Sequence, residues 1–76
     1  MRSRRAQHTA ETLAALVRAA RNQFARKGFE NASLQEIATA ARVTTGAIYH
    51  HFEDKKGLFI AVAEQIEQEL DRIGLK

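Results

Sequence analysis

The segment "TTGAIYHHFEDKK", residues 44–56, concentrates side chains that can form hydrogen bonds or bind a metal or an anion. It holds a threonine pair, a tyrosine, two adjacent histidines and two lysines, but only three large apolar residues. Three kinds of chemistry are open to such a set: metal binding through the histidines, acid–base catalysis, and recognition of a surface rich in phosphates or polar edges. A segment this short and polar makes a poor core helix, so we expect it to face a partner.

The histidine pair invites a metal hypothesis, which its spacing disfavours. His50 and His51 are neighbours, and adjacent residues on a helix point about 100° apart. No third ligand follows at a metal-binding spacing, so no metal is expected, and His51 is interpreted as a residue that packs at the helix edge. Catalysis has no support either, because the chain lacks a Ser/His/Asp arrangement and a glycine-rich phosphate loop. We expect neither an enzyme nor a cofactor.

The composition is that of one small domain. At 76 residues the chain is near the lower limit for a fold held by apolar burial alone, and it has no cysteine. Disulfides, thiolate metal sites and cysteine nucleophiles are therefore excluded, and a reducing cytoplasm suits the chain. No apolar run approaches the roughly 18 residues of a membrane span. The basic N-terminus is not followed by an apolar stretch, so we expect no signal peptide, no anchor and no membrane partner.

Positive charge is concentrated toward the N-terminus. Residues 1–56 carry ten Lys/Arg against five Asp/Glu, a net charge of +5, whereas residues 57–76 carry two against four, a net charge of −2. The basic part is the candidate for an acidic partner such as nucleic acid. A simpler interpretation is that Arg18, Arg21, Arg26 and Lys27 only solvate the outer face of a helix.

The chain has no proline and is rich in alanine, which favours an all-α fold. A first helix is expected at about residues 9–27, behind a basic flexible arm at residues 1–8. Thr9 would cap this helix and Gly28 would stop it in a left-handed conformation, which would bring Phe29 against Phe24.

Two short helices are expected next, at about residues 33–41 and 44–51. Ser33 and Glu36 form a capping box, in which each side chain bonds to the backbone amide of the other residue. Thr44 is the next cap, three residues beyond Ala41. Two helices of about two turns, joined by a tight turn, make a helix-turn-helix motif, whose second helix enters the DNA major groove.

This motif explains the polar segment. Ile48 and Phe52 would face the core and leave the other side of the helix outward. Gly46 would let the backbone approach a phosphate or a thymine methyl closely, at a cost to the helix of roughly 1 kcal/mol relative to alanine. The outward residues are Thr45, Gly46, Tyr49 and His50.

A fourth, long helix is expected within residues 54–76. Asp54 would cap it, and Lys55 and Lys56 next to the helix N-terminus would form an anion site. Its apolar stripe runs through Ile66 and Ile73, further than three short helices can cover. We interpret it as a connector to something absent from this chain. The alternative is a helical protein-interaction module that docks through this helix.

Residues 24–59 resemble the DNA-binding domain of the TetR family of bacterial transcriptional regulators. Several spacings must hold together for this resemblance. The matching pieces are Gly28-Phe29, Ser33-Leu34 with Ile37-Ala38, Ala41 with Val43, and then Tyr49, Phe52, Lys55 and Leu58.

The resemblance implies a three-helix helix-turn-helix domain on residues 9–56, followed by the connecting helix. It also implies roles in binding double-stranded DNA. Ser33 and Thr44 would bind phosphates, Thr45 and Gly46 would face bases, and Tyr49 and His50 would contact backbone or base. Lys55 would grip a phosphate, Gln35 matches a position that reaches a base in some members, and Arg5, with Arg2 and Arg4, resembles an arm for the minor groove.

At the level of the whole protein, the resemblance implies a cytoplasmic, ligand-responsive repressor. It would act as a homodimer on a palindromic operator. The fourth helix would connect to a ligand-binding and dimerisation domain absent from this chain, through which a small-molecule inducer would act. One departure concerns the turn: Arg42 stands where the family usually has glycine. Arg42 must accept a left-handed backbone or shift the turn, at a cost of order 1 kcal/mol.

Overall fold

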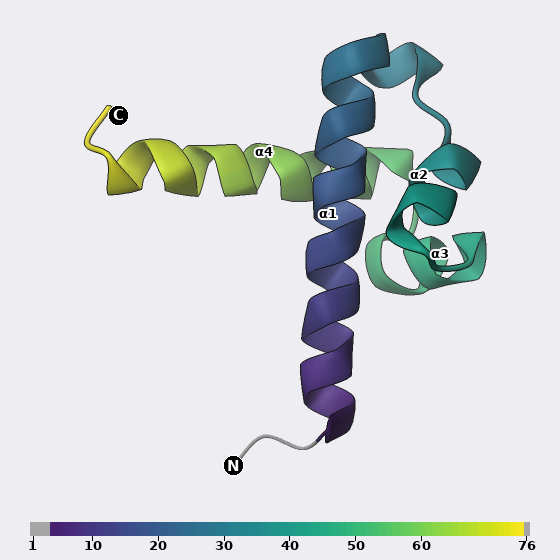
Figure 1. Ribbon diagram of the computed structural model, residues 1–76. Coiled ribbons are helices and arrows are strands. Elements are labelled where there is room, and N and C mark those ends of the chain that lie inside the picture. The colour runs from purple at the N-terminus through teal and green to yellow at the C-terminus, as the bar shows by residue number, and fades with distance from the viewer. Residues whose placement is uncertain (1–3, 76) are drawn as a thin grey trace.

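The computed structural model describes residues 4–75, with side chains from residue 9 onward. Four helices follow one another: α1 (Arg4–Asn31), α2 (Leu34–Ala41), α3 (Thr45–Phe52) and α4 (Lys55–Arg72). Figure 1 shows α4 crossing α1, with α2 and α3 together on the side of α1 where α4 begins. The C-terminal half of α4 projects beyond α1 on the other side (Figure 1). The expected all-α fold is confirmed, and the described residues contain no strand.

All four helices contribute to the core, and α1 contributes the most buried apolar residues. Each helix contributes one large side chain with no exposed surface, and the four are Leu16, Ile37, Ile48 and Leu58. Full burial of such a side chain contributes about 1.5–3 kcal/mol relative to leaving it in water. The apolar spacing that predicted four helices is therefore what joins them, and smaller residues such as Ala20 and Ala38 let the helices approach closely.

The first helix differs from the prediction at both ends. It begins at Arg4, so Thr9 lies inside the helix and does not cap it, and residues 4–8 are helical where an arm was expected. No proline or glycine separates Arg4 from Thr9, so nothing in this stretch stops the helix. At the other end Gly28, with φ 79°, interrupts the helix as predicted, but one further turn continues to Asn31.

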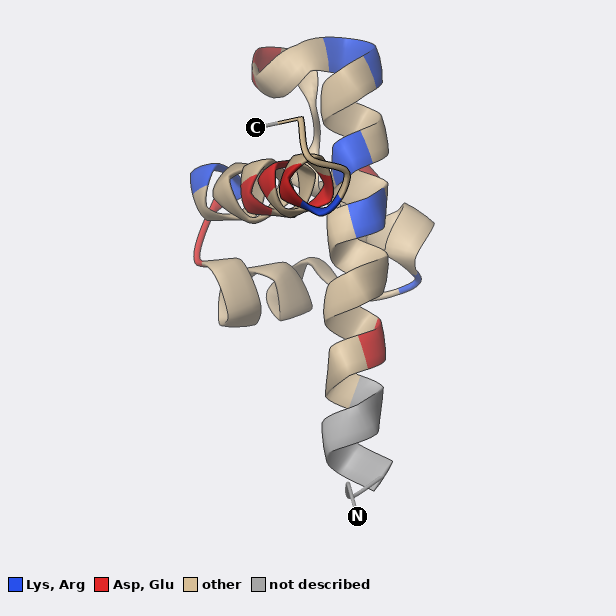
Figure 2. Cartoon of the chain, turned by 90° about the vertical axis from the view of Figure 1, so that its left-hand side faces the viewer, with Lys and Arg blue, Asp and Glu red and all other residues tan. Residues whose placement is uncertain are grey.

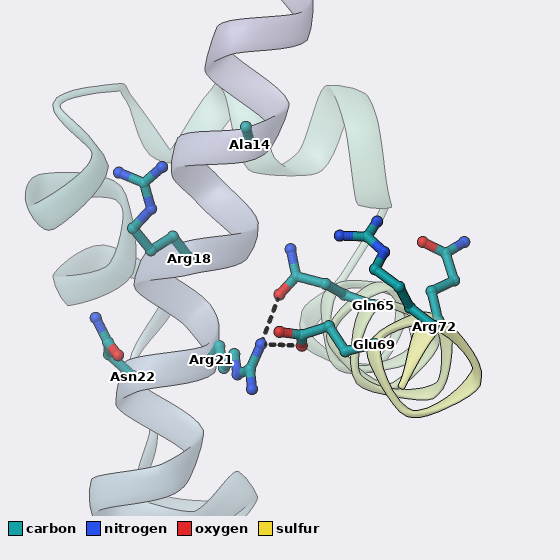
Figure 3. A pocket seen from close by; sticks show the side chains of 8 residues that line it. Ala14, Arg18, Arg21, Asn22, Gln65, Glu69 and Arg72 are labelled. Carbon is teal, nitrogen blue, oxygen red and sulfur yellow. Dashed lines mark hydrogen bonds and ion pairs between the residues drawn. The ribbon is translucent and has the colours of Figure 1, made fainter. Parts of the chain in front are cut away.

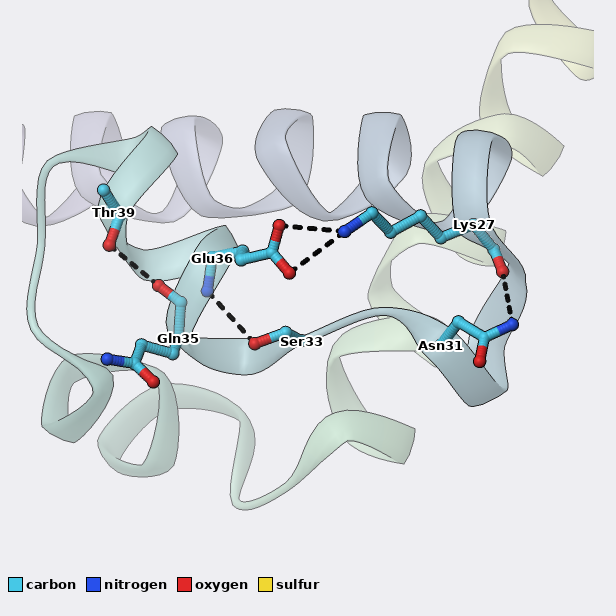
Figure 4. Close-up of polar contacts among 6 residues, drawn as sticks. All are labelled: Lys27, Asn31, Ser33, Gln35, Glu36 and Thr39. Atoms are coloured by element: carbon cyan, nitrogen blue, oxygen red, sulfur yellow. Dashed lines mark hydrogen bonds and ion pairs between the residues drawn. The ribbon is translucent and has the colours of Figure 1, made fainter.

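The hydroxyl caps of α2 and α3 form as predicted, but the Glu36 side chain has a different hydrogen-bond partner from the one expected. The Ser33 hydroxyl accepts a hydrogen bond from the Glu36 amide, and the Thr44 hydroxyl accepts one from the Ala47 amide, both at 3.3 Å. The second half of the capping box is wrong, because the Glu36 carboxylate accepts from the Lys27 ammonium. Figure 4 shows this pair beside the Ser33 cap. An ammonium offers a charge-assisted bond, which is stronger than one from a neutral amide.

Of the two outcomes expected for the turn between α2 and α3, the structure has the left-handed backbone at Arg42 and not a shifted turn. Arg42 adopts a left-handed conformation, with φ 61° and ψ 40°, and closes α2. The next amide, of Val43, donates to the Ala38 carbonyl at 2.9 Å. The turn geometry is kept despite the missing glycine, at the expense of backbone strain at Arg42.

Helix α4 starts as expected but stops earlier. The Asp54 carboxylate accepts from the Gly57 amide at 2.8 Å, which confirms the predicted cap. The helix ends at Arg72, and not beyond Ile73, because Gly74 takes a positive φ of 76°. The amide of Leu75 then donates to Leu70 and that of Gly74 to Asp71, the pair of bonds that closes a helix at a left-handed glycine.

Candidate nucleic-acid interface

Helix α3 presents one polar face to solvent. Ile48 is fully buried and fixes the rotation of the helix, and Phe52 packs against the same core. The residues predicted to face outward, Thr45, Gly46, Tyr49 and His50, are all exposed. Tyr49 keeps 55% of its surface accessible, so its ring is available for contacts outside the domain. The structure thus brings these four residues to one surface, which we call the α3 face.

Two hydroxyls cap the helices of the helix-turn-helix motif. Ser33 precedes α2 and Thr44 precedes α3, and each side chain accepts a hydrogen bond from the first turn of its helix. A hydroxyl that accepts one bond keeps its own proton to donate. The first backbone amides of each helix also point outward from its N-terminus, where an anion is favoured. These caps serve the fold first and can serve an anion as well.

Gln35, in the first turn of α2, is exposed. Its side chain points away from α1 in Figure 4, and its backbone carbonyl accepts from the Thr39 hydroxyl at 2.9 Å. This leaves the amide group of Gln35 directed to the outside of the domain. Arg5 lies in the first turns of α1, but its side chain lies outside the described residues.

The two histidines contact each other edge to face. Their ring centroids lie 4.8 Å apart, and the His51 ring also meets Phe52 at 6.3 Å. His51 is half-buried against the helix edge, whereas His50 is exposed. Among residues 9–75, no group of three His, Cys, Asp or Glu side chains is placed to hold a metal ion.

Lys55 makes contacts within the protein that the sequence did not predict. Its ammonium donates to the Glu30 carbonyl at 3.3 Å and to the Ala32 carbonyl at 3.2 Å. It also lies 4.7 Å from the centroid of the Phe29 ring. The side chain is half-buried against the connection between α1 and α2, so it does not extend into solvent as a free phosphate-binding group would. Sequence spacing could not reveal these contacts, which join residues more than twenty positions apart.

Basic and acidic residues lie in different parts of the molecule, as the charge distribution in the sequence suggested. Figure 2 shows Lys and Arg spread along α1 and at the start of α4, and Asp and Glu gathered on the C-terminal half of α4. The acidic residues there are Glu64, Glu67, Glu69 and Asp71. An anionic partner is therefore disfavoured at the far end of α4, and the basic residues that could attract one lie on α1 and at the start of α4.

A polar pocket between α1 and α4 was not anticipated. Its lining includes Arg18 and Arg21 of α1 and Gln65, Glu69 and Arg72 of α4 (Figure 3). The Arg21 guanidinium donates to the Gln65 amide oxygen at 3.2 Å and forms an ion pair with Glu69. These bonds connect the two long helices across their crossing.

No helix in the described part of the chain is both long and apolar enough to span a bilayer.

Comparison with known proteins identifies a family. Residues 16–62 match the family described as "Bacterial regulatory proteins, tetR family". The chain is 40% identical over 70 residues to the HTH-type transcriptional regulator AcrR of Shigella flexneri, a match that covers 92% of this chain and 33% of the relative. It is 47% identical over 53 residues to the HTH-type transcriptional repressor BepR of Brucella suis, covering 70% of this chain and 25% of the relative.

A third relative is the transposon Tn10 TetC protein of Escherichia coli, 46% identical over 54 residues, with 71% of this chain and 27% of the relative covered. The chain therefore spans about a quarter to a third of the length of these curated relatives. No solved structure gives a significant match. All three alignments describe the helical region that carries the α3 face.

Proposed function

This chain belongs to the TetR family of bacterial regulatory proteins, and from that membership we propose that it is the DNA-reading part of a transcription regulator. The observation that carries the proposal is the α3 face. Four polar or small residues are exposed together on a short helix whose opposite side is fixed by the fully buried Ile48. A helix held this way can enter a major groove without losing its packing to the domain.

We propose that contacts to the DNA backbone and contacts to bases come from different residues. Ser33 and Thr44 donate hydroxyl and amide hydrogen bonds to phosphates, which fix the position of the domain on the duplex. Thr45 and Gly46 lie against base edges, where a methyl or a bare backbone can meet a thymine. Tyr49 and His50 contact backbone or base, Gln35 reaches toward a base, and Arg5 lies at the neighbouring minor groove.

For the whole protein, we propose a ligand-responsive repressor that binds a palindromic operator as a homodimer. Ile66 and Leu70 support a larger assembly, because 38% and 40% of their surfaces are exposed on α4 and would be covered by further protein. An inducer would bind to that further protein, in a ligand-binding and dimerisation domain beyond α4. The protein would work where chromosomal DNA is, in the bacterial cytoplasm, and the proposal includes no catalytic step and no cofactor.

The competing candidate is a helical module that docks a partner protein through α4. The exposed apolar residues at the end of α4 favour it, Ile73 most of all with 65% of its surface accessible. It gives no role to the exposed α3 face. Under this candidate, Ile66→Ser would abolish function and leave DNA binding intact.

Selection of bound sequences from a random duplex pool tests the proposed function. The wild-type chain should enrich one sequence motif over successive rounds. Thr45→Val removes a hydroxyl with little change in volume, and we expect it to change the base preference at one or two positions. Gln68→Ala, on the far part of α4, is the matched control and should enrich the wild-type motif. Absence of any enrichment by the folded wild-type chain would contradict sequence-specific reading.

A further inference from the structure

Lys55 connects three parts of the molecule that the sequence separates. It opens α4 directly after the α3 helix has ended, and its ammonium reaches back to the connection between α1 and α2. The carbonyl of Glu30, in the last turn of α1, and that of Ala32, in the connection, accept its hydrogen bonds at 3.3 and 3.2 Å. The ammonium therefore satisfies acceptors at the C-terminal end of α1, where helix carbonyls lack partners within the helix.

The Ala32 carbonyl is the more consequential acceptor. It belongs to the peptide group that joins Ala32 to Ser33, and Ser33 caps α2. A bond to this carbonyl restrains the peptide plane, and with it the direction in which the Ser33 amide and hydroxyl point. Ala32 is itself 5% exposed, so the neighbouring chain is anchored in the core on one side and bonded to Lys55 on the other.

An aromatic cluster supports the lysine from beneath. Phe29 stacks with Phe24 at a centroid distance of 5.8 Å, and Phe59 of α4 meets both rings edge to face, at 5.2 and 5.3 Å. Lys55 lies over the Phe29 ring at 4.7 Å, within range of a cation–π interaction. The three rings join the end of α1 to the first turns of α4, and the Lys55 ammonium lies over one of them, that of Phe29.

We infer that Lys55 is a positioning residue for DNA binding, one that holds the N-terminus of α2, and Ser33 with it, at a fixed distance from the start of α4. This inference rests on the proposed function and replaces the phosphate contact expected for Lys55 from the sequence. Two of the three ammonium protons are already donated within the protein. A direct grip on phosphate would compete with these bonds, whereas positioning uses them.

Salt dependence separates the two roles. Each lysine that neutralises a DNA phosphate adds about 0.9 to the slope of log affinity against log salt. A residue that only orients another phosphate-binding group lowers affinity without removing a direct contact, so the slope stays the same. Lys55→Met keeps most of the apolar stem over Phe29 and removes the ammonium. Lys56→Met removes the same charge from the exposed neighbour and is the matched control for general electrostatics.

The experiment titrates a labelled random-sequence duplex pool with each variant over a series of salt concentrations. We expect Lys55→Met to bind roughly tenfold more weakly than the wild type at every salt concentration, with the same slope as the wild type. A slope for Lys55→Met that is shallower than that of both the wild type and Lys56→Met by about one unit would overturn the inference, because it would establish a direct phosphate contact. Unchanged affinity would overturn it as well.

Phe29→Leu gives a second, independent variant that keeps the charge and an apolar side chain. It removes the ring under the ammonium, and we expect weaker DNA binding with an unchanged salt slope. In the absence of DNA, the amide resonances of Ser33 and Glu36 should shift in Lys55→Met and stay in place in Lys56→Met.

This last measurement separates the two hypotheses. If the wild-type chain fails to bind DNA, the proposed function fails, while the Ser33 and Glu36 amides still report whether Lys55 orients the α2 N-terminus. If those amides do not move in Lys55→Met, the positioning role is excluded even where DNA binding is intact.

Discussion

The Lys27 ammonium at the end of α1 holds the Glu36 carboxylate at the start of α2, with nitrogen–oxygen distances of 2.9 and 3.0 Å (Figure 4). This pair joins two helices across the loop that carries Ser33. The hydrogen bond from Lys27 and its positive charge lower the pKa of Glu36 below its ordinary value of 4.5. Both side chains are well exposed, so solvent and salt screen the interaction.

The lowered pKa predicts a small acid-dependent loss of stability. A carboxyl whose pKa is lower in the folded state stabilises the fold above its unfolded pKa, and that contribution is lost as pH falls through the folded pKa. We expect the free energy of unfolding of the wild type to fall between about pH 6 and about pH 3 by more than that of Glu36→Gln. Urea unfolding across this range measures the difference. Parallel pH profiles would contradict the prediction, and added salt should bring the profiles together.

The left-handed backbone at Arg42 predicts that glycine at this position gives a more stable protein than alanine. Its φ of 61° is costly for a residue with a side chain and costs nothing for glycine. Arg42→Gly should therefore exceed Arg42→Ala in free energy of unfolding by about 1 kcal/mol, since both variants lose the same charge and only one relieves the strain. Urea denaturation of the two variants measures this. Equal stabilities would mean that the turn does not hold residue 42 in the left-handed conformation.

Gly57 predicts a destabilising substitution. A Cβ atom at this position would lie 2.1 Å from the carbonyl oxygen of Phe52, a backbone atom that cannot rotate away. Gly57→Ala must therefore displace the start of α4 from the end of α3, and we expect it to lower the free energy of unfolding by about 1–3 kcal/mol. Thermal unfolding with the wild type alongside measures the loss. A variant at least as stable as the wild type would show that the junction between α3 and α4 has room for the added methyl group, which would contradict the prediction.

Gly46 predicts the opposite effect on stability together with a loss of binding. A Cβ at Gly46 would meet only the Thr44 hydroxyl, at 3.6 Å, so α3 can accept alanine. Alanine is the better helix former, and Gly46→Ala should raise the free energy of unfolding by up to about 1 kcal/mol. On the α3 face the added methyl would hold the helix backbone away from DNA, and affinity should fall several-fold. Higher stability with full affinity would show that Gly46 does not approach DNA closely.

Features that depend on neighbours in sequence could be predicted. Ser33, Thr44 and Asp54 each cap a helix by accepting from the amide three residues on, which is a property of a four-residue segment. The buried residues likewise follow from apolar spacing, which is why Ile48 and the outward side of its helix were identified together. A local pattern also suggested the contact between Phe24 and Phe29, whose ring centroids lie 5.8 Å apart.

Features that depend on tertiary contacts could not be predicted this way. The Lys55 ammonium bonds to carbonyls 23 and 25 residues earlier in the chain, and only the packing of α4 against α1 makes them neighbours. Glu36 had a local partner in Ser33 and took Lys27 instead, a choice that depends on where the end of α1 lies. The end of α4 is different, because it depends on Gly74, a local signal from which sequence alone could predict it.

The central claim is that the α3 face binds DNA. The most direct test is an anisotropy titration of a labelled random-sequence duplex pool with the wild-type chain, Tyr49→Ala and Arg72→Gln, each at a low and a moderate salt concentration. Arg72 lies at the far end of α4, so its variant removes a positive charge away from the proposed surface. We predict that the wild type and Arg72→Gln bind alike and weaken steeply with salt, and that Tyr49→Ala binds much more weakly at both concentrations. Equal binding by all three proteins, or no binding by the folded wild type at low salt, would contradict the account.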